Sequence, residues 1–323
     1  MFLRILKSNP ILLLVFAILI GTAIWIWSLL GQSIRYNGNT TFFNNFWIWV
    51  SKAKMFSVGP GFILLLAEAF IWNSFVNNNT LLKQSSYFPA FFVIILSSSR
   101  VALIGLYPSL CSSLFLMLAL RRLVASYKKE NALANVFDAG LFIGIASLIY
   151  PPVTIFILFL WIAILTIRSL IWREWVVAII GFILPIGFAF LYHFLFLNDS
   201  VYSFSKLILS LGNYRKHWSF TWEEWLLLFV FISIGIASFW LFVNKMPDNV
   251  VKAQKVWALI LWFVLFAFVS VFISAERDAR SLVVLVLPVS FVFSNYFLKS
   301  KSAIWSEFLF LCLLITISLS LFF

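Results

Sequence analysis

Residues 153–165 read VTIFILFLWIAIL, and residues 225–242 read WLLLFVFISIGIASFWLF. Both runs are apolar almost throughout, and neither alternates between apolar and polar residues. Repeated apolar runs of about 18 residues or more indicate helices that cross a membrane. A membrane β-barrel would instead need strands of about ten residues with alternating hydrophobicity. We therefore predict an all-α, polytopic membrane protein.

The composition agrees with this class. The chain has 323 residues, of which 63% are hydrophobic and 11% charged, and its mean hydropathy is +1.06. A soluble domain is normally about a quarter charged. The formal charge of +12 would suggest nucleic acid as the partner of a soluble protein. Here the basic residues flank the apolar runs, where they set membrane orientation, so we expect no nucleic-acid partner.

The apolar runs divide the chain into about eleven spans within one integral membrane domain, residues 1–323. The predicted spans are 10–30, 57–76, 86–106, 108–125, 135–150, 152–168, 174–196, 224–243, 256–274, 281–298 and 303–322. Around Ser97–Arg100 the alternative is one broken helix in place of two short spans. Residues 41–54 and 200–212 carry apolar side chains at helical spacing, which predicts interfacial amphipathic helices, with an ordinary aromatic belt as the alternative.

Orientation follows from the distribution of basic residues. With the N-terminus in the cytoplasm, 14 of the 23 Lys and Arg residues fall on the cytoplasmic side. Every connection predicted to be cytoplasmic then carries at least one of them. We therefore expect a cytoplasmic N-terminus and a C-terminus on the outer side.

The densest charge lies at residues 276–280, which read ERDAR and join two apolar runs. Charge beside hydrocarbon is expensive, so this turn is a candidate functional site. Arginine binds phosphate in a bidentate manner and keeps its charge. The predicted topology places Arg100, Arg215, Arg277 and Arg280 on the outer side, where they form a candidate site for a lipid phosphate. The alternative is a set of salt bridges within the turn.

Glu68 is the second candidate, because it lies near the middle of the second predicted span. A carboxyl group at that depth must be paired, hydrated or protonated. It could be a proton site, a polar group that lines a cavity, or a protonated side chain bonded to a neighbouring helix. The sequence has no metal-ligand spacing and no nucleotide-binding motif, so we expect no metal and no cofactor.

Two segments resemble the GT-C superfamily of polytopic glycosyltransferases, which use polyprenyl-phosphate sugars. Residues 138–152 read DAGLFIGIASLIYPP and look like the family's glycine-containing helix. Residues 277–288 read RDARSLVVLVLP and are similar to its late outer turn, which handles lipid phosphate. The resemblance implies a GT-C-like fold that binds a polyprenyl-phosphate-linked substrate at the outer leaflet. The chain also resembles uncharacterised, Phe-rich bacterial inner-membrane proteins, which implies that location and no activity. In an inner membrane, the outer side predicted above for the C-terminus is the periplasm.

The chain departs from the GT-C pattern in the first outer loop, where active enzymes usually carry an acid. Residues 31–40 read GQSIRYNGNT and contain none. An amide cannot act as a general base, so either Asp278 and Glu276 are the catalytic acids or catalysis has been lost. The sequence therefore leaves three functions open: a glycosyltransferase of cell-envelope glycan assembly, a non-enzymatic subunit with an integral membrane partner, and a transporter or lipid flippase that uses Glu68.

Overall fold

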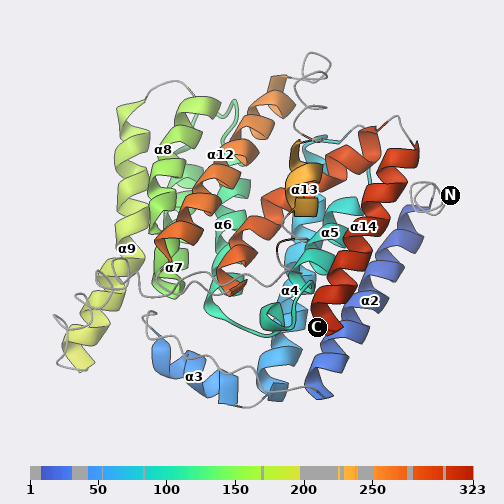
Figure 1. The fold of residues 1–323 in the computed structure, drawn as a ribbon. Helices are drawn as coiled ribbons and strands as arrows, with labels where there is room; N and C mark the ends of the chain where they lie inside the picture. The colour runs from blue at the N-terminus through green and yellow to red at the C-terminus, as the bar shows by residue number, and fades with distance from the viewer. Residues whose placement is uncertain are drawn as a thin grey trace.

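A computed structural model describes residues 9–30, 43–52, 54–82, 84–168, 171–196, 225, 229–236, 238, 251–274, 279–300 and 303–322. Within these ranges every regular element is helical and none is a strand (Figure 1). Among the described residues, six helices are long and apolar enough to cross a membrane. They are α2 (Pro10–Leu30), α4 (Lys54–Asn78), α6 (Pro108–Ala125), α9 (Trp172–Phe196), α12 (Val251–Ile273) and α13 (Val283–Lys299), which follows the 3-10 turn η4 (Ala279–Leu282).

The described part of the chain has four further apolar helices, whose apolar segments are shorter. They are α5 (Phe88–Ser97), α7 (Leu133–Ile149), α8 (Phe156–Ile167), which follows the 3-10 turn η2 (Pro151–Ile155), and α14 (Ala303–Phe322). The structure confirms an all-α protein with several apolar helices, as expected for a multi-pass membrane protein. The count of eleven spans goes further and stays a prediction.

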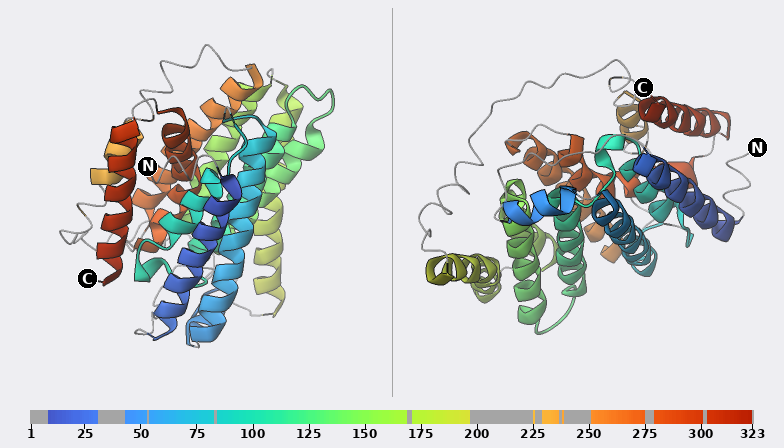
Figure 2. Two further views of the ribbon diagram at one scale, coloured as in Figure 1. Left: turned by 90° about the vertical axis from the view of Figure 1, so that its right-hand side faces the viewer. Right: turned by 90° about the horizontal axis from the view of Figure 1, so that it is seen from below.

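Two of the predicted segments lie partly or wholly outside the described residues. Of the predicted span 224–243, residues 225, 229–236 and 238 are described, and these are helical. The predicted interfacial helix 200–212 lies outside the described residues. Within 41–54 the structure has helix α3 (Asn44–Lys52), which crosses one end of the bundle (Figures 1 and 2).

The predicted span over residues 86–106 is not one continuous helix, and the break lies around Ser97–Arg100, where a broken helix was the alternative. Helix α5 ends at Ser97, and the chain continues through three turn residues and the 3-10 turn η1 (Val101–Leu103) before α6 begins. A helix of ten residues rises about 15 Å, which is half of a hydrocarbon core of about 30 Å. All ten residues of α5 are buried. Irregular backbone inside a membrane protein is tolerated where protein surrounds it, and Ser98 and Ser99, which directly follow α5, are both buried.

Helix α5 is the centre of one half of the bundle. It packs against α2, α4 and α13, and Phe91 stacks on Phe310 of α14 with ring centroids 5.8 Å apart. Phe92 stacks on Phe297 of α13 at 5.3 Å. Figure 2 shows α2, α4 and α14 grouped around this short helix. The phenylalanine-rich composition therefore serves helix packing in this half as well as contact with lipid.

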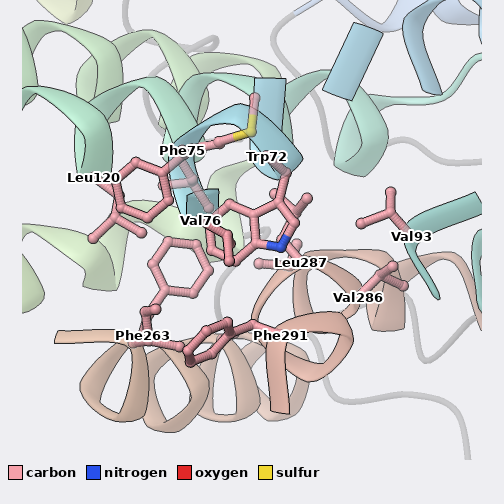
Figure 3. Packing of buried hydrophobic residues seen from close by; sticks show 14 of the residues in the cluster. Trp72, Phe75, Val76, Val93, Leu120, Phe263, Val286, Leu287 and Phe291 are labelled. Atoms are coloured by element: carbon pink, nitrogen blue, oxygen red, sulfur yellow. The ribbon is translucent and has the colours of Figure 1, made fainter. Parts of the chain in front are cut away.

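A second core joins α4, α6, α12 and α13 (Figure 3). Trp72 is fully buried, and its indole N–H donates a hydrogen bond to Ser290 Oγ at 3.0 Å. Trp257 is also fully buried, lies 4.3 Å from Phe291 between ring centroids, and donates to the carbonyl oxygen of Leu81 at 3.3 Å. Both indoles thus satisfy the buried N–H that would otherwise destabilise an apolar core.

Helices α7 and α9 are in backbone contact because glycines line their interface. A Cβ atom added at Gly140 would lie 2.4 Å from the carbonyl oxygen of Ala178. A Cβ atom added at Gly144 would lie 2.4 Å from the carbonyl oxygen of Phe182. A Cβ atom added at Gly181 would lie 2.4 Å from the carbonyl oxygen of Phe137 on α7. Small residues four apart permit this close approach of membrane helices. The glycines of the segment 138–152 therefore have a packing role.

The two ends of the bundle differ in charge. We call "basic end" the end at which α6, α8 and α13 stop and α7, α9 and α12 start, and "far end" the opposite one (Figure 1). The basic end holds Arg121, Arg122, Lys128, Lys129, Arg168, Arg173, Lys252, Lys255 and Lys299. Among the described residues the far end holds Lys52, Lys54, Arg100 and Arg280.

Candidate functional site

Two of the predicted phosphate-binding arginines lie at one corner of the far end. Arg280 is in η4 and Arg100 directly precedes η1, and these two 3-10 turns are in contact. The Arg280 Nε–H donates to the carbonyl oxygen of Ala102 at 3.2 Å, and the Ser109 hydroxyl donates to the carbonyl oxygen of Arg280 at 2.7 Å. Both arginines are half-buried. Tertiary structure therefore brings together two turns that are far apart in the sequence, with Arg280 in one and Arg100 directly before the other.

The other predicted site residues at this end are not placed. Glu276, Arg277 and Asp278 precede η4 directly in the chain, and they lie outside the described residues, as does Arg215. Their roles as catalytic acids and as phosphate ligands therefore stay predictions.

Glu68 lies in α4, and its side chain is only 2% exposed. The Ser113 hydroxyl on α6 lies 2.7 Å from Glu68 Oε1. Within the part of the chain that the structure describes, the Glu68 carboxyl makes no ion pair. The side chain is thus bonded to a neighbouring helix, as one of the sequence interpretations expected, and its partner is a neutral hydroxyl.

Two serines on one face of α6 bond to Glu68 and to the backbone of Arg280, one serine to each. Ser109 and Ser113 are four residues apart, so they share one face of the helix, and both are buried. Ser109 contacts Arg280, and Ser113 contacts Glu68. We call these four residues the polar track. It leads from the far end about one helical turn into the bundle along α6.

Sequence reasoning missed the serines of the polar track. The available signal was the grouping of Ser109, Ser112 and Ser113 in the first turns of an otherwise apolar helix. Serine hydroxyls in helices often bond to their own backbone three or four residues earlier, and Ser112 does so here by donating to Ser109 O at 2.9 Å. Because that local bond is common, the grouping alone does not reveal a contact with another helix.

The chain segment that carries Arg100 is anchored from two sides. The indole N–H of Trp25 on α2 donates to Ser98 Oγ at 2.9 Å, and the Ser320 hydroxyl on α14 donates to Ser99 O at 2.6 Å. Buried polar groups need such partners. The break after α5 is therefore a defined structure, and it holds the backbone before Arg100 in one place.

The candidate residues offer two kinds of chemistry: the arginines can bind an anion, and the Glu68 carboxyl group can bind a proton. Among the described residues, no group of three His, Cys, Asp or Glu side chains could hold a metal ion. The arginines suit an anionic ligand such as phosphate, and the buried carboxyl suits a proton. The arginines therefore lie at the rim of the bundle, whereas the titratable carboxyl group of Glu68 is buried.

Comparison with known proteins gives a family and no activity. Over residues 1–323 the chain matches the sequence model of a family described as of unknown function, DUF6427. No curated protein and no solved structure matches the chain, so these comparisons lend no support to the resemblance to the GT-C superfamily. Since the match covers its whole length, this multi-pass membrane protein belongs to the DUF6427 family.

Proposed function

We propose that the protein binds the phosphate group of a membrane lipid at its far end, through Arg280 and Arg100. The preferred lipid in this proposal is a polyprenyl phosphate that carries a sugar for cell-envelope glycan assembly. The observation that carries the proposal is the contact between the turns η1 and η4, which places Arg280 beside the segment that begins at Arg100, at one corner of the bundle.

The charge asymmetry supports an outer position for this corner. Basic residues accumulate on the cytoplasmic side of membrane proteins, so we infer that the basic end is cytoplasmic in a bacterial inner membrane. The N-terminus is then cytoplasmic, and the far end and the C-terminus face the periplasm. Arg100 and Arg280 lie on the side where the orientation rule disfavours basic residues, and binding of an anionic head group gives them a role there.

The way Arg280 is held also supports phosphate binding. Its Nε–H bond to Ala102 orients the guanidinium plane, and the Ser109 contact fixes its backbone. An arginine with a fixed plane loses less conformational entropy when it binds phosphate through two parallel hydrogen bonds. A flexible lysine at the same place would lack that advantage.

The proposal includes two versions of the function. In the enzyme version the chain has eleven spans in a GT-C-like arrangement, and Asp278 and Glu276 supply the acid that residues 31–40 lack. In the second version the protein is a non-enzymatic subunit that presents the lipid carrier to an integral membrane partner. The absence of an acid from residues 31–40 favours this second version.

Replacing Arg280 by alanine is expected to weaken the binding of undecaprenyl phosphate by about 10- to 100-fold, since a hydrogen bond to a charged group contributes about 1.5–3 kcal/mol. The affinity of Arg280→Lys for this lipid should lie between those of Arg280→Ala and the original protein. Arg173→Ala is the matched control, because Arg173 is an exposed arginine at the basic end. Binding can be measured by native mass spectrometry after thermal unfolding has shown that each variant is folded.

Three lipids identify the source of the phosphate. Undecaprenyl phosphate should bind more tightly than phosphatidylglycerol, and phosphatidylcholine should bind weakly and equally to all variants. If Arg173→Ala weakens binding as much as Arg280→Ala does, or if neither affects it, the proposed site is wrong.

Asp278→Asn distinguishes the two versions of the function. In the enzyme version this variant binds the lipid normally and loses the glycan product in cells, because an amide cannot transfer the proton. In the subunit version both binding and glycan remain unchanged, and purification in mild detergent recovers a stoichiometric membrane partner.

A further inference from the structure

The Glu68–Ser113 contact contains more acceptor oxygens than one hydroxyl can serve. Ser113 Oγ lies 2.7 Å from Glu68 Oε1 and also 2.7 Å from the carbonyl oxygen of Leu110. A serine hydroxyl has one hydrogen to donate. If Glu68 is ionised, only one of these short contacts can be a hydrogen bond at a time. If Glu68 carries a proton, both are, because Glu68 donates to Ser113 and Ser113 donates to Leu110.

The surroundings of Glu68 disfavour an ionised carboxyl group. Glu68 and Ser113 are 2% and 1% exposed, respectively. Among the described residues no basic side chain forms an ion pair with Glu68. Removing an uncompensated charge from water costs several kcal/mol, and polar groups in a membrane interior are seldom tolerated without a function.

We propose that Glu68 is a proton-binding site: in the resting protein its carboxyl group is protonated and donates its hydrogen to Ser113 Oγ. The ligand of this site is a proton. The proposal goes beyond lipid binding and does not depend on it, because it rests only on the contact between α4 and α6.

The positions of Ser109 and Arg280 indicate the end of the bundle at which the Glu68 proton exchanges with solvent. Ser109 lies one turn from Ser113 on the same face of α6, toward the far end. On that side the track ends at Arg280, which is half-buried and therefore reaches the surface. We expect the Glu68 proton to exchange with solvent at the far end, and more slowly than the protons of exposed carboxyl groups.

Infrared spectroscopy of the purified protein tests the protonation directly. At neutral pH, exposed acids are already ionised, so a C=O stretch of a protonated carboxyl group reports a buried one. We expect the protein to show this band and Glu68→Gln to lose it, whereas Asp138→Asn, at an exposed carboxyl, should keep it. If Glu68→Gln instead loses only carboxylate intensity, Glu68 is ionised and the proposal is overturned.

Ser113→Ala and transfer to D2O provide independent checks, also for the case in which Glu68→Gln fails to fold. Loss of the acceptor should move the band to higher frequency if Glu68 donates to Ser113, and an unmoved band would contradict the assigned hydrogen bond. In D2O the band should move to lower frequency as the proton exchanges. A band that is unchanged after prolonged exposure to D2O would overturn the exchange with the far end.

Discussion

Replacing Glu174 by alanine is expected to lower the free energy of unfolding by about 3–5 kcal/mol, because it leaves a buried arginine without its counter-charge. Arg168 Nε lies 2.8 Å from Glu174 Oε1, and the two side chains are 9% and 3% exposed. The Nε–H is not aimed closely enough at the carboxylate to form a hydrogen bond, so the contact is an ion pair. Its partners come from the end of α8 and the start of α9.

Arg168 also ties down the connection between α6 and α7. One of its terminal nitrogens, Nη1, donates to the carbonyl oxygens of Ser126 and Lys129 at 2.8 and 2.6 Å. Loss of Glu174 would therefore affect the Arg168 guanidinium, which contacts several helix ends at the basic end. A double replacement of Arg168 and Glu174 by leucine should be less destabilising than Glu174→Ala, because no buried charge is left behind.

The exposed pair at the same end is the matched control. Arg122 Nε lies 3.3 Å from Asp138 Oδ2, with side chains 48% and 36% exposed. Asp138→Ala should cost no more than about 1 kcal/mol, since water and salt screen such a pair. Thermal unfolding in detergent, followed by tryptophan fluorescence, measures both variants. Equal losses of stability would show that burial of the Arg168–Glu174 pair is not the decisive factor.

Gly181→Ala is the second large expected effect, with a loss of about 1–3 kcal/mol from overpacking. The added Cβ would lie 2.4 Å from the carbonyl oxygen of Phe137, which is backbone and cannot rotate away. Helices α7 and α9 would have to separate along their contact. Gly140→Ala, on the opposite side of the same interface, should have an effect of similar size.

Gly187→Ala provides the control within the same helix. A Cβ atom at Gly187 would have no neighbour within 4 Å, and alanine favours a helix over glycine by about 1 kcal/mol. This variant should be as stable as the original protein or slightly more stable, as measured by the same thermal unfolding. If both replacements lower stability alike, close packing at Gly181 is not the cause.

The role of these glycines also affects the interpretation of function. Residues 138–152 carried part of the resemblance to the GT-C superfamily, and in the structure Gly140 and Gly144 contact the backbone of α9. Close helix packing is sufficient to explain the motif. The proposed function therefore depends on the corner formed by Arg100 and Arg280 and gains nothing from that segment.

Hydrophobic periodicity and length alone determined the class of this protein. Apolar runs without alternation predict membrane helices whatever their neighbours are, and the all-α, multi-pass architecture is confirmed. Within 86–106 the sequence left a break around Ser97–Arg100 undecided, because Ser98 and Ser99 lie in a run that remains apolar on average. Helix α5 ends there because α2 and α14 supply hydrogen bonds to these serines, and a linear sequence does not show which helices surround a break.

For the candidate site, too, some features followed from the sequence and others only from tertiary structure. Sequence identified Glu68, Arg100 and Arg280 individually, because a charge within or beside an apolar run is costly wherever it occurs. Only tertiary structure decided that η1 and η4 touch, that Ser109 bonds to the backbone of Arg280, and that Ser113 bonds to Glu68. The physical reason is that the free-energy cost of burying a charge depends on the residue that carries it. The partner that offsets this cost depends on how helices from distant parts of the chain pack together.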